Sequence, residues 1–483
     1  CVEVNTTSGV VKGLTIDVLN TSVDQFLAIP YAEPPVGVLR FAKPNAIKTQ
    51  KFLAIPYAEP PVGVLRFAKP NAIKTQKYID GTKHGKSCVQ KFVAELDDFD
   101  PVRNITQSED CLVLNVWTPT VRTGDRQKAA LKPVMFWMHG GALITGSSFQ
   151  WQYNGTALAT NDVVIVSVNY RLGPFGFLYG DREDAPGNIG LYDMLFALNW
   201  VRENVHSFGG DRDQITIFGE SAGTWAGAST LILSPLSKGL FKRAIMESGA
   251  HYYNSRDPMS KAEALTFAKQ LAKSMNCTDG QKWLDCLRGI DAQALIKGYD
   301  TVVQVFPLLD TELLPLPAQK AFKLDSFNKD LDIMVGLMRN EGSSLINTLV
   351  KPNQTLKDYQ DFVALIDTIY HNFDIKRVEE FYLKQSIDAN NSNAILWAEY
   401  DMFGDVRISC PTYRFAKAYA QLGGAGGVYF YEQTYQRKSF LDEKVYGVTH
   451  QADVDYVFGA PLLYPTITDT TIDTQFSRQP TEP

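Results

Sequence analysis

Short apolar runs alternate with helical patterns along most of the chain. Residues 133–138 and 162–169 are apolar runs of strand length, and the second is strongly β-branched. Residues 191–205 carry apolar side chains at helical spacing, and residues 357–425 have a mainly helical pattern. Further strand-like runs lie at 214–218, 241–246, 331–337 and 428–431. Strands that alternate with helices predict an α/β fold, with a mostly parallel central sheet and helices on both faces.

The chain also contains one identical internal repeat. Residues 26–51 (FLAIPYAEPPVGVLRFAKPNAIKTQK) recur unchanged at 52–77. Solenoid repeats diverge and come in threes or more, so a perfect pair indicates a duplication and not a repeat architecture. We expect one copy to pack natively and the other to form an excursion at the surface. The sequence leaves open which copy docks, or whether the start of the first and the end of the second are used.

The composition is that of a globular protein, with 45% hydrophobic and 21% charged residues. This excludes a disordered, collagenous or coiled-coil chain. The 47 basic and 53 acidic residues give a formal net charge of −6 without a basic run, so we expect no nucleic-acid partner. We also expect no transmembrane helix and no signal peptide. The chain has neither an apolar stretch of about 18 residues nor a basic-then-apolar start.

The cysteines and glycosylation motifs indicate an oxidising compartment. The six cysteines include no C-x-x-C pair, so disulfides are favoured over a zinc site or dithiol chemistry, and no metal or cofactor is expected. Seven N-x-S/T motifs suit a secreted glycoprotein, and we expect a secreted or extracellular protein, or one in the secretory-pathway lumen. The motifs lie at Asn5, Asn20, Asn104, Asn154, Asn276, Asn353 and Asn390.

A candidate nucleophile lies at the end of a predicted strand. Residues 219–223 read GESAG, which fits G-x-S-x-G with a strand before it and small residues and a helix after it. The glycines leave room for a strained turn that lifts the Ser221 hydroxyl clear of the sheet. The alternative is a Gly/Ser-rich turn without chemistry. The agreement of strand, turn and helix favours the nucleophile.

A serine hydroxyl needs a base within hydrogen-bond reach, and in this motif the order along the chain is serine, acid, histidine. His450, in a loop after the last predicted strand, is the expected base. His371 lies in a helical pattern that favours an exposed structural role, and His251 follows Ser221 too closely for a strand-end acid between them. Activity should follow neutral imidazole, with an apparent pKa near about 6.5.

The acid should occupy a strand end, where it fixes the imidazole tautomer. Glu341 follows the strand-like run 331–337 across a short turn and is the first choice. Asp310 and Glu312, in an irregular stretch bounded by proline, are the competitors.

The reaction also needs donors for the oxyanion of the tetrahedral intermediate. Residues 139–142 read HGGA directly after the strand 133–138, the composition of an oxyanion loop. We expect the backbone N–H groups of Gly141, Ala142 and Ala222 to converge on that oxygen. The alternative is a tight glycine turn.

With these residues, the chain resembles the type-B carboxylesterase and cholinesterase family of α/β hydrolases over nearly its whole length. The motifs, in family order, are FLAIPYAEPPVGVLRF, SEDCLVLNVW, HGG, NYRLGPFGF, APGNIGLYDMLFALNWVRENV, FGGD, FGESAG, RAIMESG, the Glu341 turn and GVTH with DYVFG. The resemblance implies one α/β-hydrolase domain over 1–483 and a serine carboxylic ester hydrolase that forms an acyl-enzyme. The residues it implies are Ser221, Glu341 and His450 as the triad, Gly141, Ala142 and Ala222 as oxyanion donors, and Glu220 and Ser248 beside them.

The resemblance also implies the cross-links of the chain. The implied disulfides are Cys88–Cys111 and Cys277–Cys286. Cys410 resembles a cysteine whose partner lies in a C-terminal segment that relatives have and this chain lacks, and Cys1 matches no family cysteine. Glu109 should form a salt bridge with an arginine of the LRF motif, which the repeat supplies twice, as Arg40 and Arg66.

The expected substrate is a small carboxylic ester. Choline-ester selectivity is less favoured, because residues 89–110 contain no tryptophan for an aromatic cation site, only Phe92 and Phe99. Residues 301–306 (TVVQVF) align with the family's acyl pocket and imply a roomier one. A non-catalytic adhesion domain and a lipase remain alternatives, and the sequence leaves the oligomeric state and any membrane anchor open.

Overall fold

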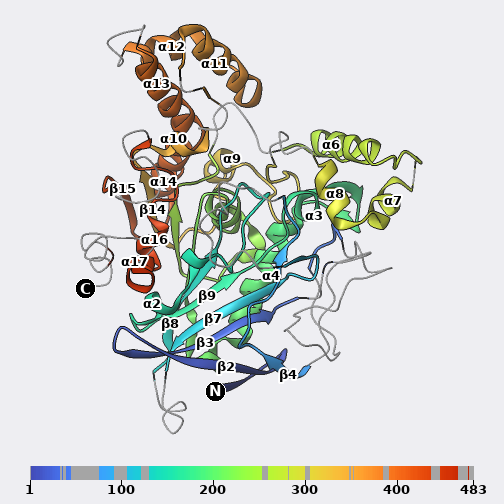
Figure 1. Ribbon diagram of the computed structural model, residues 1–483, viewed down its shortest axis with the longest axis vertical. Helices are drawn as coiled ribbons and strands as arrows, with labels where there is room; N and C mark the ends of the chain where they lie inside the picture. Colours follow the sequence, from blue (N-terminus) through green and yellow to red (C-terminus); the bar gives the residue numbers. More distant parts are fainter. Residues whose placement is uncertain are drawn as a thin grey trace.

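The computed structural model of the chain is built around one large twisted sheet (Figure 1). It describes residues 2–32, 35, 40–44, 76–91, 106–120, 130–252, 259–280, 282–299, 305–346, 350–351, 353–384, 391–436, 446–465 and 477. The strands of this sheet are β1 (Val2–Thr6), β2 (Gly9–Val18), β3 (Thr21–Pro30), β4 (Gln76–Asp80), β7 (Val113–Pro119), β8 (Lys132–Met138), β9 (Val164–Val168), β12 (Gly210–Glu220), β13 (Arg243–Glu247), β14 (Asp332–Met338) and β15 (Val428–Gln433). Two small sheets pair β5 (Ser87–Cys88) with β6 (Gln107–Ser108) and β10 (Tyr179–Arg182) with β11 (Ala185–Pro186).

Along its main path the sheet is antiparallel at the N-terminal edge and parallel elsewhere, and β4 adds a parallel pairing to β2. Its order is β1-β2-β3-β7-β9-β8-β12-β13-β14-β15, with β4 paired to β2. Neighbours from β1 to β9 run antiparallel, and neighbours from β9 to β15 run parallel. The predicted α/β fold with a mostly parallel sheet is confirmed. The strand-like runs of the sequence correspond to β8, β9, β12, β13, β14 and β15.

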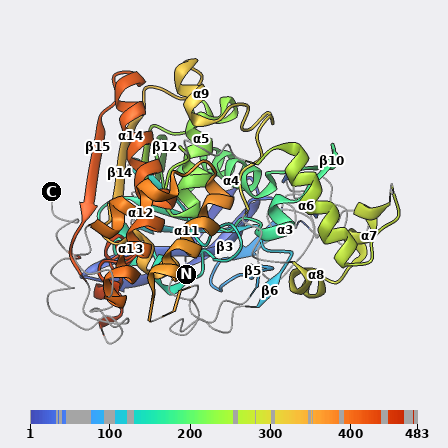
Figure 2. The same cartoon turned by 90° about the horizontal axis from the view of Figure 1, so that it is seen from above.

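Helices are packed around the sheet. Figures 1 and 2 show α6, α7 and α8 grouped on one side of the molecule and α11, α12 and α13 on another. The helices are α2 (Thr156–Ala159), α3 (Gly173–Phe177), α4 (Ile189–Asn204), α5 (Ser229–Leu233), α6 (Lys261–Ser274), α7 (Trp283–Gly289), α8 (Ala292–Gly298), α9 (Ala318–Lys323), α10 (Glu341–Leu345), α11 (Leu356–Tyr370), α12 (Ile375–Lys384), α13 (Ser392–Gly404), α14 (Cys410–Leu422), α16 (Val454–Val457) and α17 (Ala460–Leu463). Among those in the described ranges, none has the length and hydrophobicity needed to cross a membrane.

Local chemistry explains why several of these elements form where they do. Every residue of β9 is buried, as expected for a β-branched strand in the middle of a parallel sheet. Capping boxes start α6 at Ser260 and α11 at Thr355, where they satisfy the first backbone N–H groups of the helix. Asp193 of α4 accepts a bidentate ion pair from Arg171, which ties the longest central helix to the chain after β9.

The repeat contributes its two outer ends to the sheet. The start of the first copy forms the end of β3, where Phe26 and Ile29 are fully buried. The end of the second copy starts β4, where Gln76 pairs with Gly9 of β2. Residues 52–75 lie outside the described residues. The arrangement is therefore the start of the first copy with the end of the second, which the sequence had left open.

The arginine of the first copy forms the salt bridge that the resemblance implied. Arg40 is fully buried, and its Nη2 donates to Glu109 Oε2 at 2.5 Å, while its Nε donates to the other carboxylate oxygen. Nη1 also donates to the carbonyl oxygens of Leu287 and Ile290, at 3.0 and 2.9 Å. This one guanidinium thus links the docked copy to the loop before β7 and to the end of α7. Arg66 lies outside the described residues.

The two implied disulfides are confirmed. Cys88 is bonded to Cys111, and Cys277 to Cys286, where the second bond joins the segment after α6 to the middle of α7. Cys410 is an exposed free thiol at the start of α14. Cys1 lies outside the described residues.

Deleting residues 26–51 should leave the protein at least as stable and as soluble as the full chain. The deletion gives the same sequence as deleting 52–77, so it keeps one complete copy. Lengthening a loop from about ten to about thirty-six residues costs only roughly 1 kcal/mol, so removing the excess changes stability little. The melting temperature and the elution volume in size-exclusion chromatography are measured. A clear fall in melting temperature would show that both copies are structural.

Replacing Arg40 by alanine should lower the free energy of unfolding by about 3–5 kcal/mol, because it leaves the Glu109 carboxylate without its partner. Arg66→Ala is the matched control and should stay within about 0.5 kcal/mol of the parent. Urea denaturation measures both. The second copy could dock Arg66 in place of the lost side chain, so Arg40→Ala is also made in the 26-residue deletion, where no twin exists. Equal effects of the two substitutions in the full chain would contradict the assignment.

Candidate active site

The candidate nucleophile lies on a sharp turn between β12 and a π-helical segment, Gly223–Ala228. Ser221 has a φ of 50°, a left-handed conformation that is strained for a serine, and its side chain is partly exposed. Its backbone N–H donates to the carbonyl of Glu247 at 2.9 Å. The turn is therefore held in place by β13, the neighbouring strand.

The two glycines of the G-x-S-x-G motif allow a close approach of β8. A Cβ atom on Gly219 would lie 2.5 Å from the carbonyl oxygen of Met138, and one on Gly223 would lie 2.0 Å from it. Both are far below contact distance, so the end of β8 and the turn fit together only without side chains there. Packing therefore requires the two glycines of the motif, in addition to any chemical role of the motif.

The HGGA loop follows β8 and lies against the candidate nucleophile. A Cβ atom on Gly140 would be 3.2 Å from Ser221 Cβ. Gly141, Ala142 and Leu143 have φ values of 105°, 55° and 64°, a strained run that turns the backbone sharply. Such consecutive backbone N–H groups form concavities that bind anions. The HGGA loop, the oxyanion loop predicted from the sequence, therefore lies beside Ser221.

His139, the first residue of this loop, is held in place by Tyr170. Its ring stacks on Tyr170 with centroids 4.3 Å apart, and the Tyr170 hydroxyl donates to the His139 carbonyl at 2.7 Å. Burial lowers the pKa of His139 to about 4, so the ring is neutral at physiological pH. We assign it a structural role.

The predicted acid and base meet in the structure. His450 Nδ1 lies 2.5 Å from Glu341 Oε2, and both side chains are buried. The other oxygen of Glu341 accepts a hydrogen bond from the backbone N–H of Met338 at 2.7 Å. A carboxylate fixed in this way on Nδ1 leaves Nε2 as the nitrogen that can take part in proton transfer.

Main-chain contacts bring these two residues together across more than a hundred positions of sequence. Asn340 and Thr449 form an isolated parallel bridge, and the Asn340 N–H donates to the Val448 carbonyl at 3.0 Å. Beyond His450, the ring of Phe458 packs edge-on against Trp137 of β8 at 4.9 Å. The loop that carries His450 is therefore held at both ends.

Nε2 of His450 faces a second carboxyl group. It lies 2.9 Å from Glu220 Oε1, but the angle is not that of a hydrogen bond, and within the described part of the chain Nε2 has no hydrogen-bond partner. The structure therefore contains no Ser221–His450 hydrogen bond. Such catalytic hydrogen bonds are often long in free enzymes and form only with substrate.

The two carboxyl groups control the protonation of His450. Burial by itself lowers the pKa of His450, but the negative charges of Glu220 and Glu341 outweigh burial and raise it to about 10. This is higher than the value of about 6.5 expected from the sequence. Burial raises the pKa of Glu220, and the neighbouring imidazolium opposes that effect. A carboxyl group on each side of the His450 ring thus favours the imidazolium, which is the form that His450 takes after it has accepted a proton as general base.

Two further buried acids near the site were not predicted from the sequence. Asp453 accepts a hydrogen bond from the Tyr431 hydroxyl at 3.0 Å, and burial together with the charge of Glu220 raises the pKa of Asp453 to about 7. Burial and the charge of Asp453 raise the pKa of Glu247 well above its usual range. The only sequence signals were the position of Asp453 three residues after His450 and that of Glu247 before Ser248.

The other residues that were considered from the sequence lie outside the acid–base pair. Asp310 and Glu312 are exposed, and Glu312 pairs with Lys43. His371 is an exposed residue at the end of α11, as expected. His251 is buried, and burial lowers its pKa to about 4. Ser248 follows β13 with a φ of 54°, and its N–H donates to the Gly336 carbonyl at 2.9 Å, beside the nucleophile turn as the resemblance implied.

A family profile and several known proteins match most of the chain. A profile of the Carboxylesterase family matches residues 1–51 and 45–482. Acetylcholinesterase of Leptinotarsa decemlineata is 32% identical over 516 residues, which cover 95% of this chain and 74% of that protein. Acetylcholinesterase of Bungarus fasciatus and cholinesterase of Mus musculus are 31% and 32% identical over 484 residues, again with 95% of this chain and 74% of each protein covered.

Replacing Glu220 by glutamine should move the acid limb of the pH–activity profile to lower pH. The imidazole must be neutral to accept a proton, so kcat/KM rises with pH through the pKa of His450. Removing a negative charge 2.9 Å from Nε2 lowers that pKa, by about one to three pH units for a charge at such a distance. The midpoint is measured from kcat/KM for a small acetate ester. Glu203→Gln, on the exposed face of α4, is the control and should leave the midpoint unchanged. A midpoint that stays in place or rises in Glu220→Gln would refute the electrostatic assignment.

Proposed function

This chain belongs to the carboxylesterase family, and from that premise we propose that it hydrolyses small carboxylic esters through an acyl-enzyme formed on Ser221. The observation that carries the proposal is the contact of His450 with Glu341 next to the nucleophile turn and the HGGA loop. An acid–base pair, a strained serine and an anion-binding loop are the parts that acyl transfer requires.

In the first half of the proposed reaction, Ser221 Oγ attacks the ester carbonyl carbon. His450 Nε2 accepts the hydroxyl proton, and the imidazolium is stabilised by Glu341 on Nδ1 and by Glu220 near Nε2. The backbone N–H groups of Gly141, Ala142 and Ala222 stabilise the oxyanion of the tetrahedral intermediate. When that intermediate collapses, the C–O bond to the alcohol breaks and His450 returns the proton to the leaving oxygen.

In the second half, water replaces the alcohol. His450 accepts a proton from the water as it attacks the acyl carbon, and the same donors stabilise the second oxyanion. Collapse releases the carboxylic acid, and Ser221 recovers its proton. The net reaction consumes one ester and one water molecule, releases one alcohol and one carboxylic acid, and regenerates Ser221 and His450.

A general carboxylic ester substrate is favoured over a choline ester. The relatives named above are acetylcholinesterases and a cholinesterase, which keeps choline esters as a second candidate. Against it, residues 89–110 of this chain contain no tryptophan to hold a quaternary ammonium. Residues 92–105 and 301–304, where the loop phenylalanines and most of the acyl-pocket segment fall, lie outside the described residues. Comparing kcat/KM for acetylcholine and for an uncharged acetate ester of similar size decides between the two.

The cross-links support a location in an oxidising compartment. Two disulfides are formed, and four of the seven glycosylation motifs, at Asn5, Asn20, Asn276 and Asn353, have an exposed asparagine. Asn154 is a poor glycosylation site in the folded protein, because its side chain donates to the Tyr464 hydroxyl at 2.8 Å. We infer a secreted or extracellular protein.

Ser221→Ala should abolish both covalent labelling by a fluorophosphonate and hydrolysis of an acetate ester, with activity falling at least about 10³-fold. Ser326→Ala, at an exposed position, is the control, and it should be labelled and should hydrolyse the ester as the parent does.

Glu341→Gln should reduce kcat on the order of 10⁴-fold, because the amide favours the wrong imidazole tautomer. Asp310→Asn should have no such effect. Labelling that persists in Ser221→Ala would refute the nucleophile, and full activity in Glu341→Gln would refute the acid.

A further inference from the structure

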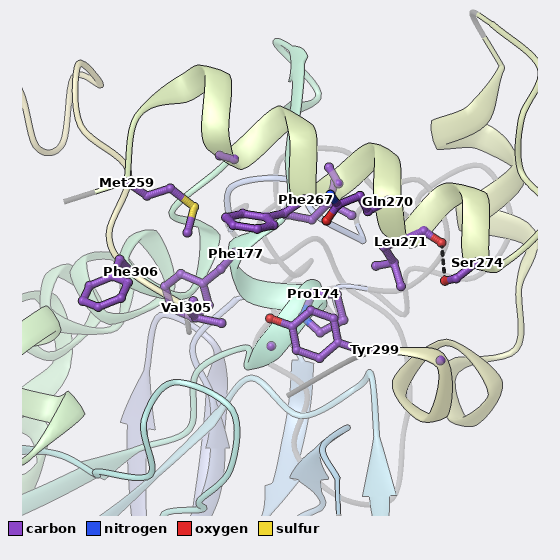
Figure 3. A pocket seen from close by; sticks show the side chains of 15 residues that line it. Pro174, Phe177, Met259, Phe267, Gln270, Leu271, Ser274, Tyr299, Val305 and Phe306 are labelled. Atoms are coloured by element: carbon purple, nitrogen blue, oxygen red, sulfur yellow. Dashed lines mark hydrogen bonds between the residues drawn. The ribbon is translucent and has the colours of Figure 1, made fainter. Parts of the chain in front are cut away.

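A cavity of about 290 Å³ lies between α3, α6 and the segment before β14 that contains Val305 and Phe306 (Figure 3). Pro174 and Phe177 of α3 form one wall, and Phe267 and Leu271 of α6 form the opposite one. The volume is close to the lower end of the range for small-molecule sites, roughly 300–1,000 Å³. The cavity is therefore large enough for a compact small molecule.

Among the described residues that line the cavity, none is charged. Its polar side chains are Gln270, Ser274 and Tyr299. Gln270 and Ser274 are exposed on α6, whereas Val305 and Phe306 are buried. The cavity thus has a polar end open to water and an apolar end inside the protein.

The α6 wall is held in a fixed position. Ser260 and Glu263 form a capping box at its first turn, and the disulfide Cys277–Cys286 ties the chain after its last turn to α7. The ammonium of Lys269 lies 4.5 Å from the ring centroid of Trp283, which adds a contact between the same two helices. A site with fixed walls loses little conformational entropy when a ligand binds.

The cavity is separate from the reacting residues. Neither Ser221, His450, Glu341 nor the residues of the HGGA loop line it. Phe306 lines the cavity and packs on Trp225, which follows the nucleophile turn, with ring centroids 5.8 Å apart. The Arg407 guanidinium lies over both rings, at 5.2 and 5.4 Å. Through these contacts the inner end of the cavity packs on the helical segment that follows Ser221.

We propose that the cavity is a binding site for a neutral, mainly aliphatic small molecule with one hydroxyl or carbonyl end, outside the Ser221–His450–Glu341 group but adjoining, through Val305 and Phe306, the segment that aligns with the family's acyl pocket. The apolar part of the ligand packs against Phe177, Val305 and Phe306, and its polar end lies near Gln270 and Ser274. A charged ligand is disfavoured, because its charge would lose water without gaining an ionic partner from the lining. A medium-chain alcohol fits this description.

Binding is tested with N-phenyl-1-naphthylamine, a neutral apolar dye whose fluorescence rises in apolar sites, on full-length protein with Ser221 blocked by diisopropyl fluorophosphate. We expect the dye to bind the blocked and unblocked protein alike. 1-Decanol should displace it at least tenfold better than decanoate, which has the same chain length and a negative charge. Dye binding lost on blocking, or equal displacement by the two competitors, would overturn the proposal without affecting the assignment of Ser221.

Location is tested by filling the cavity from α6. Ala268 is buried and lines the cavity, whereas Ala262 is exposed on the same helix, so Ala268→Leu and Ala262→Leu form a matched pair. Ala268→Leu should weaken dye binding at least tenfold, with acetate-ester hydrolysis unchanged, and Ala262→Leu should bind as the parent. Ala264→Leu, a second lining position, replaces Ala268→Leu if that variant does not fold. Unweakened binding in a folded, cavity-filled variant would overturn the proposal.

Discussion

The arrangement of the site depends on one imidazole held between two buried carboxyl groups. His450 contacts Glu341 through Nδ1 and faces Glu220 through Nε2, away from bulk water. Charges in such an environment interact strongly and are costly when unpaired. The hydrogen bond from the Met338 N–H, the bridge of Asn340 with Thr449 and the packing of Phe458 all serve to keep this group together. If one carboxyl moved, both the position and the protonation of the imidazole would change.

The parallel part of the sheet explains how these residues converge and why the sequence could predict them. The HGGA loop follows β8, Ser221 follows β12, Ser248 follows β13 and Glu341 comes shortly after β14, so each lies at the carboxyl end of a parallel strand. Ligand sites form at that edge of open α/β sheets. The strand pattern and the few residues that follow each strand are therefore enough to locate these residues in the sequence. Asp453 carries no such signal, and Glu247 shares it only as the last residue of β13, so the burial of both acids, which arises from tertiary contacts, is seen only in the structure.

The repeat is a second feature for which the sequence alone cannot decide which residues pack. Arg40 and Arg66 have identical neighbours, so no local pattern can decide between them, and only the packing of Arg40 against Glu109, Leu287 and Ile290 does so. The antiparallel strands β1, β2 and β3 were also missed. In the first half of β2 the buried positions alternate with half-exposed ones, so a search for continuous apolar runs passes over this strand.

Several residues with strained backbone dihedral angles lie at the proposed active site, and the packing around them must stabilise these conformations. Ala142, Leu143, Ser221 and Ser248 all have positive φ values, each costing about 1–3 kcal/mol for a residue with a side chain. Such conformations persist only where the surrounding packing determines them. Here the buried ends of β8, β12 and β13 and the glycines that let them approach do so. The turn at Ser221 is therefore fixed by its packing on the sheet, and a side chain at Gly219 or Gly223 would collide with Met138 and displace the turn.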